Sequence, residues 1–240
     1  LSRGLGDVYK RQELTRNPNE VFLYLTEDYE VYNIDELAFY KPSLIAITGL
    51  NGHGKSFFSL YLLNNFKKLN PGLKIGYLIN EDFTLPTKIK DELNFINFHI
   101  PQDYNSLLYL AEEYDILIVD AFSNIDLLQD VSLKSEFNNN SYFNNALIDL
   151  YTLTHSKKSI IFLIVHLTKQ ARLNNKNEDK VPSLYEAYTG RLSIYVDMGL
   201  VIHKTQNQLG VYIQKNRFGT RENVFYNFQD IINTVLKEVK

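Results

Sequence analysis

The sequence contains no cysteine. Disulfide bonds and thiolate metal sites are therefore excluded, and the composition is typical of a reducing cytoplasm. Long apolar runs are also missing, since the longest, Ile160 to Val165, is far too short to cross a bilayer. The sequence shows no signal-peptide pattern. We therefore expect a cytoplasmic protein with no membrane partner.

Neither sign of charge is in large excess. The 25 Lys and Arg residues against 28 Asp and Glu residues give a net charge of −3. This balance provides no overall attraction to nucleic acid, so any such binding has to come from local basic loops. With 240 residues, of which 45% are hydrophobic and 22% charged, the chain is expected to be one globular domain with a substantial core.

The stretch from Ser43 to Leu63 organises the chain. A β-prone apolar run meets a glycine-rich turn, and apolar residues at helical spacing follow. The turn satisfies the pattern G-x-x-x-x-G-K-[ST] in full. We expect it to bind a nucleoside triphosphate through Gly49, Leu50, Asn51, Gly52, His53, Gly54, Lys55, Ser56 and Phe57.

The residue types of this turn suit a bound phosphate. Glycines let backbone N–H groups converge on an anion without an intervening Cβ, and the following helix directs its positive end at the same anion. Lys55 can reach the β- and γ-phosphates, and the Ser56 hydroxyl can ligate Mg²⁺. A chance glycine-rich loop is the alternative, but the strand before the turn and the helix after it favour an ATP and Mg²⁺ site.

Strand-like and helix-like segments alternate up to residue 166. The strands are continuous apolar runs, as in a parallel sheet covered on both faces, and the closing β-rich stretch predicts antiparallel strands at one edge. The predicted strands are 44–47, 74–79, 95–100, 114–120, 159–166, 198–203, 211–214 and 224–228. The predicted helices are 57–69, 85–93, 104–114, 143–154 and 229–239, with a short one at Ile34 to Leu37.

Three polar residues end predicted strands where a parallel sheet binds ligands. Asp120 is a candidate Mg²⁺ ligand, acting through water; otherwise it is a solvated strand end. Glu81 is the candidate base for the attacking water, with the adjacent Asp82 as the alternative. His166 is either a structural histidine or a group that hydrogen-bonds the γ-phosphate and changes its loop when the phosphate leaves.

This order of motifs, ending in Lys215-Asn216-Arg217-Phe218-Gly219, resembles the RecA-like ATPase core of hexameric replicative helicases. The similar proteins are the DnaB family, the mitochondrial helicase Twinkle and the bacteriophage primase-helicases, and the resemblance covers about residues 43–228. It implies a RecA-like P-loop NTPase fold: a mostly parallel twisted sheet flanked by helices, with antiparallel strands at one edge.

The resemblance also implies roles. The family's catalytic glutamate corresponds to Glu81, and its histidine or glutamine sensor to His166. Lys215 and Arg217 correspond to the K-x-R-x-G pair that enters the neighbouring subunit's nucleotide site; a hairpin turn with exposed charges is the alternative. The implied protein is a homo-oligomer, most simply a hexamer, that hydrolyses ATP and moves along single-stranded DNA.

A basic segment follows His166. In the family the corresponding loop tracks the phosphates of a single strand, which makes Lys169, Arg172 and Lys176 candidate DNA contacts. Acidic residues are interspersed with them, so a solvated loop is the alternative. The sequence departs from the family just beyond, where Ala187 to Ser193 replaces an Arg-Gly-Ser or Glu-Ser-Gly patch.

The expected organisation has three parts. Residues 1–12 resemble the read-through translation of a sequencing adapter and are interpreted as a non-native leader; residues 13–42 form an N-terminal extension or linker; residues 43–240 form the ATPase domain. Nothing resembling a primase or collar domain precedes the core, so a stand-alone motor domain is expected. Two other functions remain open: a recombination protein of the RecA family, and a KaiC-like regulatory ATPase whose partner is a protein.

Overall fold

The structure is a computed structural model that describes residues 29–79, 93–100, 103–125, 139–174, 180–187 and 192–237. For residues 139–142, 172–174 and 237 it describes the backbone alone. The interpreted leader, the body of the helix predicted at 85–93, and the candidates Glu81, Asp82 and Lys176 lie outside the described residues.

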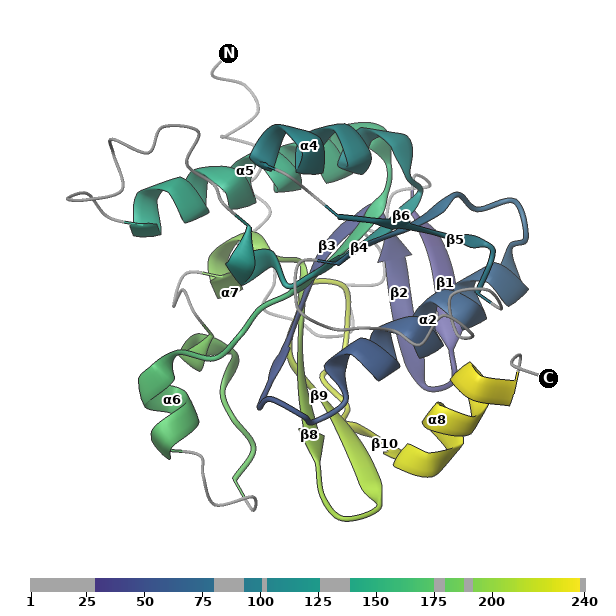
Figure 1. Cartoon of the computed structure of the whole chain (residues 1–240), viewed down its shortest axis with the longest axis vertical. Helices are drawn as coiled ribbons and strands as arrows, with labels where there is room; N and C mark the ends of the chain where they lie inside the picture. Colours follow the sequence, from purple (N-terminus) through teal and green to yellow (C-terminus); the bar gives the residue numbers. More distant parts are fainter. Residues whose placement is uncertain are drawn as a thin grey trace.

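Within the described residues, an eight-stranded sheet forms the centre of the molecule (Figure 1), with strand order β10-β9-β8-β3-β7-β6-β4-β5. The strands from β8 to β5 are parallel, and β9 and β10 are antiparallel. The predicted fold class is therefore confirmed. The strands are β3 (Ser43–Gly49), β4 (Ile75–Ile79), β5 (Ile96–His99), β6 (Ile116–Asp120), β7 (Ile160–Ile164), β8 (Met198–Lys204), β9 (Gln208–Asn216) and β10 (Val224–Asn227).

One strand departs from the expectation. The sequence grouped the run at 198–203 with the closing antiparallel strands, but β8 lies parallel to β3, with Ile45 opposite Met198. The antiparallel part begins only at β9, because the chain turns back directly after β8 and pairs with it. This arrangement makes β3 a central strand, with β7 on one side and β8 on the other.

Helices cover both faces of the sheet. The helices α2 (Lys55–Leu69) and α8 (Phe228–Lys237) lie on one side, and α4 (Tyr104–Glu113), α5 (Asn139–Lys157) and α7 (Leu192–Tyr195) on the other (Figure 1). Alternate residues of one strand enter the two cores: Ile116 and Ile118 join the core under α2, whereas Leu117 and Val119 join the one under α4 and α5. Because strand side chains alternate in direction, a strand buried on both faces reads as a continuous apolar run.

A two-stranded hairpin packs against α2. It consists of β1 (Glu30–Ile34) and β2 (Leu37–Lys41), so the short helix predicted at Ile34 to Leu37 is wrong. Asp35 has a positive φ of 52° in the intervening turn. The hairpin forms because Ile34, Leu37 and Phe39 bury their side chains in the core that α2 shares with the sheet, a long-range contact that outweighs local helical spacing.

Short helical elements complete the described part. They are α6 (Lys169–Asn174) and two 3₁₀ turns, η2 (Phe122–Asn124) and η4 (Leu184–Glu186). Local capping fixes η4, because the Ser183 hydroxyl accepts from the Tyr185 N–H and the Glu186 carboxylate accepts from the Ser183 N–H. Among the described residues, no helix has both the length and the apolar character that a membrane crossing requires.

Candidate nucleotide-binding site

The glycine-rich turn joins β3 to α2 and needs two of its glycines for close packing. Gly49 has a φ of 150°, and a Cβ there would lie 2.2 Å from the backbone oxygen of Ile202. Gly54 has a φ of 87°, and a Cβ there would lie 2.6 Å from the Phe228 ring. Larger residues would strain the backbone and push the loop away from β8 and α8. The turn is thus held tightly at the carboxyl edge of the sheet.

Lys55 folds back over this turn. Its Nζ donates to the backbone oxygens of Gly49, at 3.2 Å, and Leu50, at 3.0 Å. The residue is 7% exposed, and it is the first residue of α2. An ammonium group therefore lies at the positive end of a helix, beside a loop of glycines, which is an arrangement suited to a phosphate.

Ser56 and Asp120 meet at the same edge. The Ser56 hydroxyl donates to Asp120 Oδ2 at 2.7 Å, and Asp120 is the last residue of β6, 2% exposed. Hydroxyl and carboxylate oxygens are the hard donors that Mg²⁺ prefers, and a phosphate-bound Mg²⁺ takes its other ligands from phosphates and water. The described residues contain no cluster of three or more His, Cys, Asp or Glu side chains that could hold a metal. The adjacent oxygens of Ser56 and Asp120 fit a Mg²⁺ that takes its other ligands from a nucleotide and water.

His53 ties the turn to β8. Its Nδ1 accepts from the backbone N–H of Lys204 at 3.0 Å, and its ring lies 5.2 Å from that of His203. Burial lowers the pKa of His53 to about 4, with smaller contributions from His203, Lys55 and Lys204. The imidazole is therefore neutral at physiological pH and keeps its acceptor nitrogen. The Lys204 ammonium in turn lies 4.1 Å from the centre of the Phe228 ring.

Of the other two strand-end candidates, His166 lies within the described residues and Glu81 does not. His166 lies two residues beyond β7, which runs between β3 and β6, and its backbone N–H donates to the Ser123 hydroxyl at 3.4 Å. Ile79, the last residue of β4, is paired with Asp120. The carboxyl end of β4 is therefore beside Asp120, and Glu81 itself lies outside the described residues.

Lys215 and Arg217 lie at the opposite end of the parallel strands, where β3 and β8 begin; we call this the amino edge, and the end that carries the phosphate loop the carboxyl edge. The backbone N–H of Arg217 donates to the oxygen of Asp197, just before β8, and an Asp197 carboxylate oxygen accepts from the Leu44 N–H near the start of β3. From Leu44 to Gly49 is five residues, which spans about 17 Å in a strand. Arg217 is therefore remote from the phosphate loop of its own chain.

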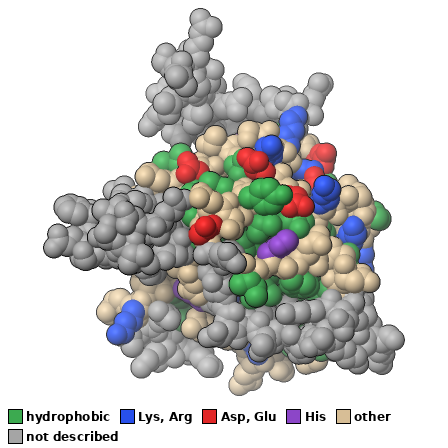
Figure 2. Space-filling model, turned by 45° about the horizontal axis from the view of Figure 1, so that its top comes forward, with side chains coloured by type: hydrophobic (Ala, Val, Ile, Leu, Met, Phe, Trp, Pro, Cys, Tyr) green, Lys and Arg blue, Asp and Glu red, His purple; other side chains and the backbone are tan. Residues whose placement is uncertain are grey.

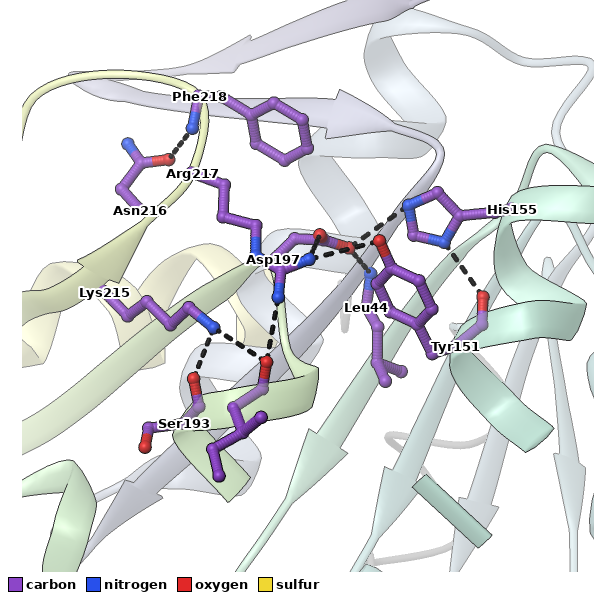
Figure 3. A network of polar contacts seen from close by, with 10 residues as sticks. Leu44, Tyr151, His155, Ser193, Asp197, Lys215, Asn216, Arg217 and Phe218 are labelled. Atoms are coloured by element: carbon purple, nitrogen blue, oxygen red, sulfur yellow. Dashed lines mark hydrogen bonds and ion pairs between the residues drawn. The ribbon is translucent and has the colours of Figure 1, made fainter. Parts of the chain in front are cut away.

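A polar network holds both cations at that edge (Figure 3). Arg217 donates through Nη1 to Asp197 Oδ1 and to the Tyr151 hydroxyl, both at 3.1 Å, and through Nη2 to the Ile194 oxygen at 2.8 Å. Lys215 donates to the oxygens of Ser193 and Ile194. Burial, followed by the neighbouring Arg217, lowers the pKa of Lys215 to about 8.

Asp197 is the centre of this network. Its side chain is 3% exposed, and His155 Nε2 lies 3.5 Å from Oδ2. Burial raises the pKa of the carboxyl, while His155, the Leu44 N–H and Arg217 act against that rise. The Arg217 side chain as a whole is 35% exposed, so part of it is accessible from outside the subunit.

The candidate DNA contacts are only partly described. Lys169 is exposed at the start of α6, Arg172 has a described backbone in the same helix, and Lys176 lies outside the described residues.

Figure 2 shows a face of the molecule on which acidic and basic side chains both border a central apolar area. Neither sign of charge covers that face, in keeping with the balanced composition.

Two polar residues at these edges were missed in the sequence. Tyr77 lies within β4, is 0% exposed and donates its hydroxyl to Asp120 Oδ2 at 2.6 Å. Asp197 immediately precedes an apolar strand. A tyrosine within a buried run usually has a partner for its hydroxyl, and an aspartate before such a run is the counterpart of one that ends it. Neither signal names the partner.

Comparisons with solved structures identify the architecture. One solved ATPase domain aligns with a TM-score of 0.62 and 14% identity over 78% of this chain and 81% of that chain. The chain has a RecA-like fold. A DnaB-like replicative helicase, solved in a study of its interactions with primase, aligns with a TM-score of 0.64 and 14% identity over 78% of this chain and 55% of that one. No family model and no curated protein matches the sequence.

Proposed function

We propose that this chain is an ATP-hydrolysing motor domain of the ring-forming helicase type, which moves along single-stranded DNA. The observation that supports the proposal is the position of two groups of side chains at opposite ends of the parallel strands. A phosphate loop with its Ser56–Asp120 pair occupies the carboxyl edge, and an accessible Arg217 lies at the amino edge. Such a subunit has one half of a shared active site at each end.

The proposed roles at the carboxyl edge follow from the residue chemistry. Lys55 binds the β- and γ-phosphates, and the oxygens of Ser56 and Asp120 hold Mg²⁺, Asp120 through water. The metal supplies positive charge that offsets the charge of the phosphates during transfer. Glu81 orients the attacking water and accepts its proton. His166 hydrogen-bonds the γ-phosphate and transmits its loss to the following segment.

Arg217 acts on the neighbouring subunit in this proposal. A guanidinium fork matches the equatorial oxygens of the phosphoryl group in the transition state. Because Arg217 and the phosphate loop occupy opposite edges, a head-to-tail assembly brings the amino edge of one subunit to the carboxyl edge of the next. Head-to-tail contacts close into rings or continue as filaments. In this proposal Lys215 enters the neighbouring nucleotide site together with Arg217. The ring contains six subunits.

The DNA track is proposed for the segment after His166. Lys169, Arg172 and Lys176 contact the phosphates of the strand, and repetition around the ring adds up their small local charge. This track is coupled to hydrolysis through His166, which directly precedes it in the chain.

One experiment tests the proposal against its alternatives. ATP turnover is measured with and without single-stranded DNA, and the mass of the oligomer is determined in the same buffer. A closed ring with DNA-stimulated turnover is expected. A regulatory ATPase would show turnover indifferent to DNA, and a recombination protein would form open filaments of increasing mass.

Lys55→Ala provides the control for the nucleotide site. The lysine serves the ligand, so this variant should remain folded but lose triphosphate affinity and turnover. Unchanged turnover in Lys55→Ala would remove the assignment of the site.

A further inference from the structure

A buried tyrosine contacts the candidate metal ligand from the adjacent strand. On β4, Ile79 is paired with Asp120, and Tyr77 lies two residues earlier on the same face of the sheet. Diagonal neighbours on paired strands are about 7–8 Å apart, a distance that only a long side chain crosses. The Tyr77 ring crosses it, and its hydroxyl donates to Asp120 Oδ2 at 2.6 Å.

Ser56 donates to the same oxygen. Its hydroxyl lies 2.7 Å from Asp120 Oδ2, so two hydroxyl hydrogens converge on one carboxylate oxygen. A serine hydroxyl has a single hydrogen and two lone pairs. Because the Ser56 hydrogen is engaged in the hydrogen bond to Asp120, the lone pairs of the Ser56 oxygen remain available to a cation. The direction of those lone pairs depends on where Asp120 Oδ2 is held.

We propose that Tyr77 is a positioning residue for the divalent cation of this site. Its hydroxyl holds Asp120 Oδ2 in place, and through that oxygen it orients both Asp120 and the Ser56 hydroxyl toward the metal. This inference rests on the proposed function, because the metal enters with the nucleotide. Groups that orient metal ligands in this way typically contribute roughly 10–100-fold to metal affinity or activity.

The ring of Tyr77 would pack equally well without its hydroxyl. The residue is 0% exposed, and its ring lies 5.8 Å from that of Phe98 on β5. Phenylalanine keeps the ring and its apolar contacts, and the change removes the hydrogen bond to Asp120. The Tyr77→Phe change thus removes the contact without opening a cavity.

The test measures metal binding apart from turnover. Mn²⁺ is titrated into the protein with ADP and followed by its electron paramagnetic resonance signal, for the wild type and for Tyr77→Phe. We expect roughly 10–100-fold weaker Mn²⁺ binding in the variant, with ADP affinity in the presence of EDTA unchanged. Turnover of ATP in the variant should recover as Mg²⁺ is raised.

Tyr61→Phe is the matched control. Tyr61 is 9% exposed and donates to Asp35 at 2.5 Å, so this change removes a tyrosine–aspartate hydrogen bond of the same kind beside the hairpin turn. It should lower the unfolding temperature and leave Mn²⁺ affinity unchanged. A purely structural role for Tyr77 would make the two variants behave alike.

A double-variant cycle with Ser56→Ala tests the shared oxygen. If Tyr77 acts through the hydroxyl of Ser56, Tyr77→Phe should weaken Mn²⁺ binding much less in the Ser56→Ala background than in the wild type. Equal weakening in both backgrounds would overturn the role assigned to Ser56 and leave Asp120 as the group through which Tyr77 acts. Wild-type Mn²⁺ affinity in Tyr77→Phe would overturn the inference as a whole and leave the proposed function standing. Failure of the wild type itself to bind Mn²⁺ with ADP would instead overturn the proposed function.

Discussion

Two buried aspartates lie at opposite edges of the same sheet, and they are held differently. Asp120 ends β6 at the carboxyl edge, and Asp197 precedes β8 at the amino edge; each is 2% exposed. Asp120 accepts from the neutral hydroxyls of Ser56 and Tyr77. Asp197 accepts from a guanidinium and a backbone N–H, with a histidine nearby.

The two carboxylates differ in the hydrogen-bond donors that hold them. A buried carboxylate requires compensation, because desolvation disfavours its charge. At the amino edge the chain supplies a cation of its own, Arg217, and so holds that cation at a defined position. At the carboxyl ends of the strands, two hydroxyls orient the Asp120 carboxylate, and in our proposal this carboxylate also faces a cation that arrives with a nucleotide. In our proposal the same type of side chain thus serves as a structural anchor at one end of the strands and as a metal ligand at the other.

The largest effect is expected from removing the cation at the amino edge. Arg217→Ala should lower ATP turnover by roughly 10³–10⁵-fold, because an arginine finger contributes that much, while triphosphate binding persists. Arg217→Lys keeps a positive charge beside Asp197 but lacks the planar fork, so it should remain folded and be nearly as inactive. Arg221→Ala, at an exposed position nearby, is the control and should turn over normally.

The same substitution has a separate cost in stability. In Arg217→Ala the buried Asp197 loses its guanidinium, and breaking such a pair costs about 3–5 kcal/mol when both partners are buried; the 35% exposure of Arg217 reduces this. Adding Asp197→Asn should restore most of the free energy of unfolding without restoring turnover. Chemical denaturation of the two single variants and the double variant measures this. A double variant no more stable than Arg217→Ala would show that the pair does not hold the edge.

The smallest expected effect concerns pH at the carboxyl edge. His53 has a pKa of about 4 in the fold against 6.5 in the unfolded chain, so its contribution to stability is complete above pH 6.5 and declines as the pH falls toward 4. Protonation also removes the acceptor for the Lys204 N–H. The stability difference between the wild type and His53→Gln should therefore narrow from pH 7.5 to pH 4.5. A difference that stays constant across this range would contradict the neutral-acceptor role.

The sequence was most informative where one local segment contains the whole signal. The phosphate loop needs its glycines, lysine and serine within a few residues, and the flanking strand and helix are adjacent in the chain. The error at Ile34 to Leu37 arose because a hairpin is fixed by pairing and by contacts with α2, which local spacing does not encode. The local pattern therefore predicted the positions of the sheet's strands along the chain correctly but missed the pairing of β1 with β2 at the start of the described chain.

Contacts between distant residues could not be predicted in this way. Tyr77 meets Asp120 because β4 pairs with β6, although β5 lies between them in the chain. Arg217 meets Asp197 because β9 turns back along β8 and returns its end to the start of that strand. Both contacts depend on strand order and register, so the structure was needed to find them.

The most direct test of a shared active site mixes two inactive proteins. Lys55→Ala subunits lack the phosphate-binding lysine but keep Arg217, and Arg217→Ala subunits have the reverse defect. In mixed assemblies, one kind of interface combines an intact phosphate loop with an intact Arg217 from the neighbour, so ATP turnover should reappear on mixing and rise with the fraction of mixed oligomers. Mixed oligomers that form, as shown by mass, yet stay as inactive as either parent would contradict the account.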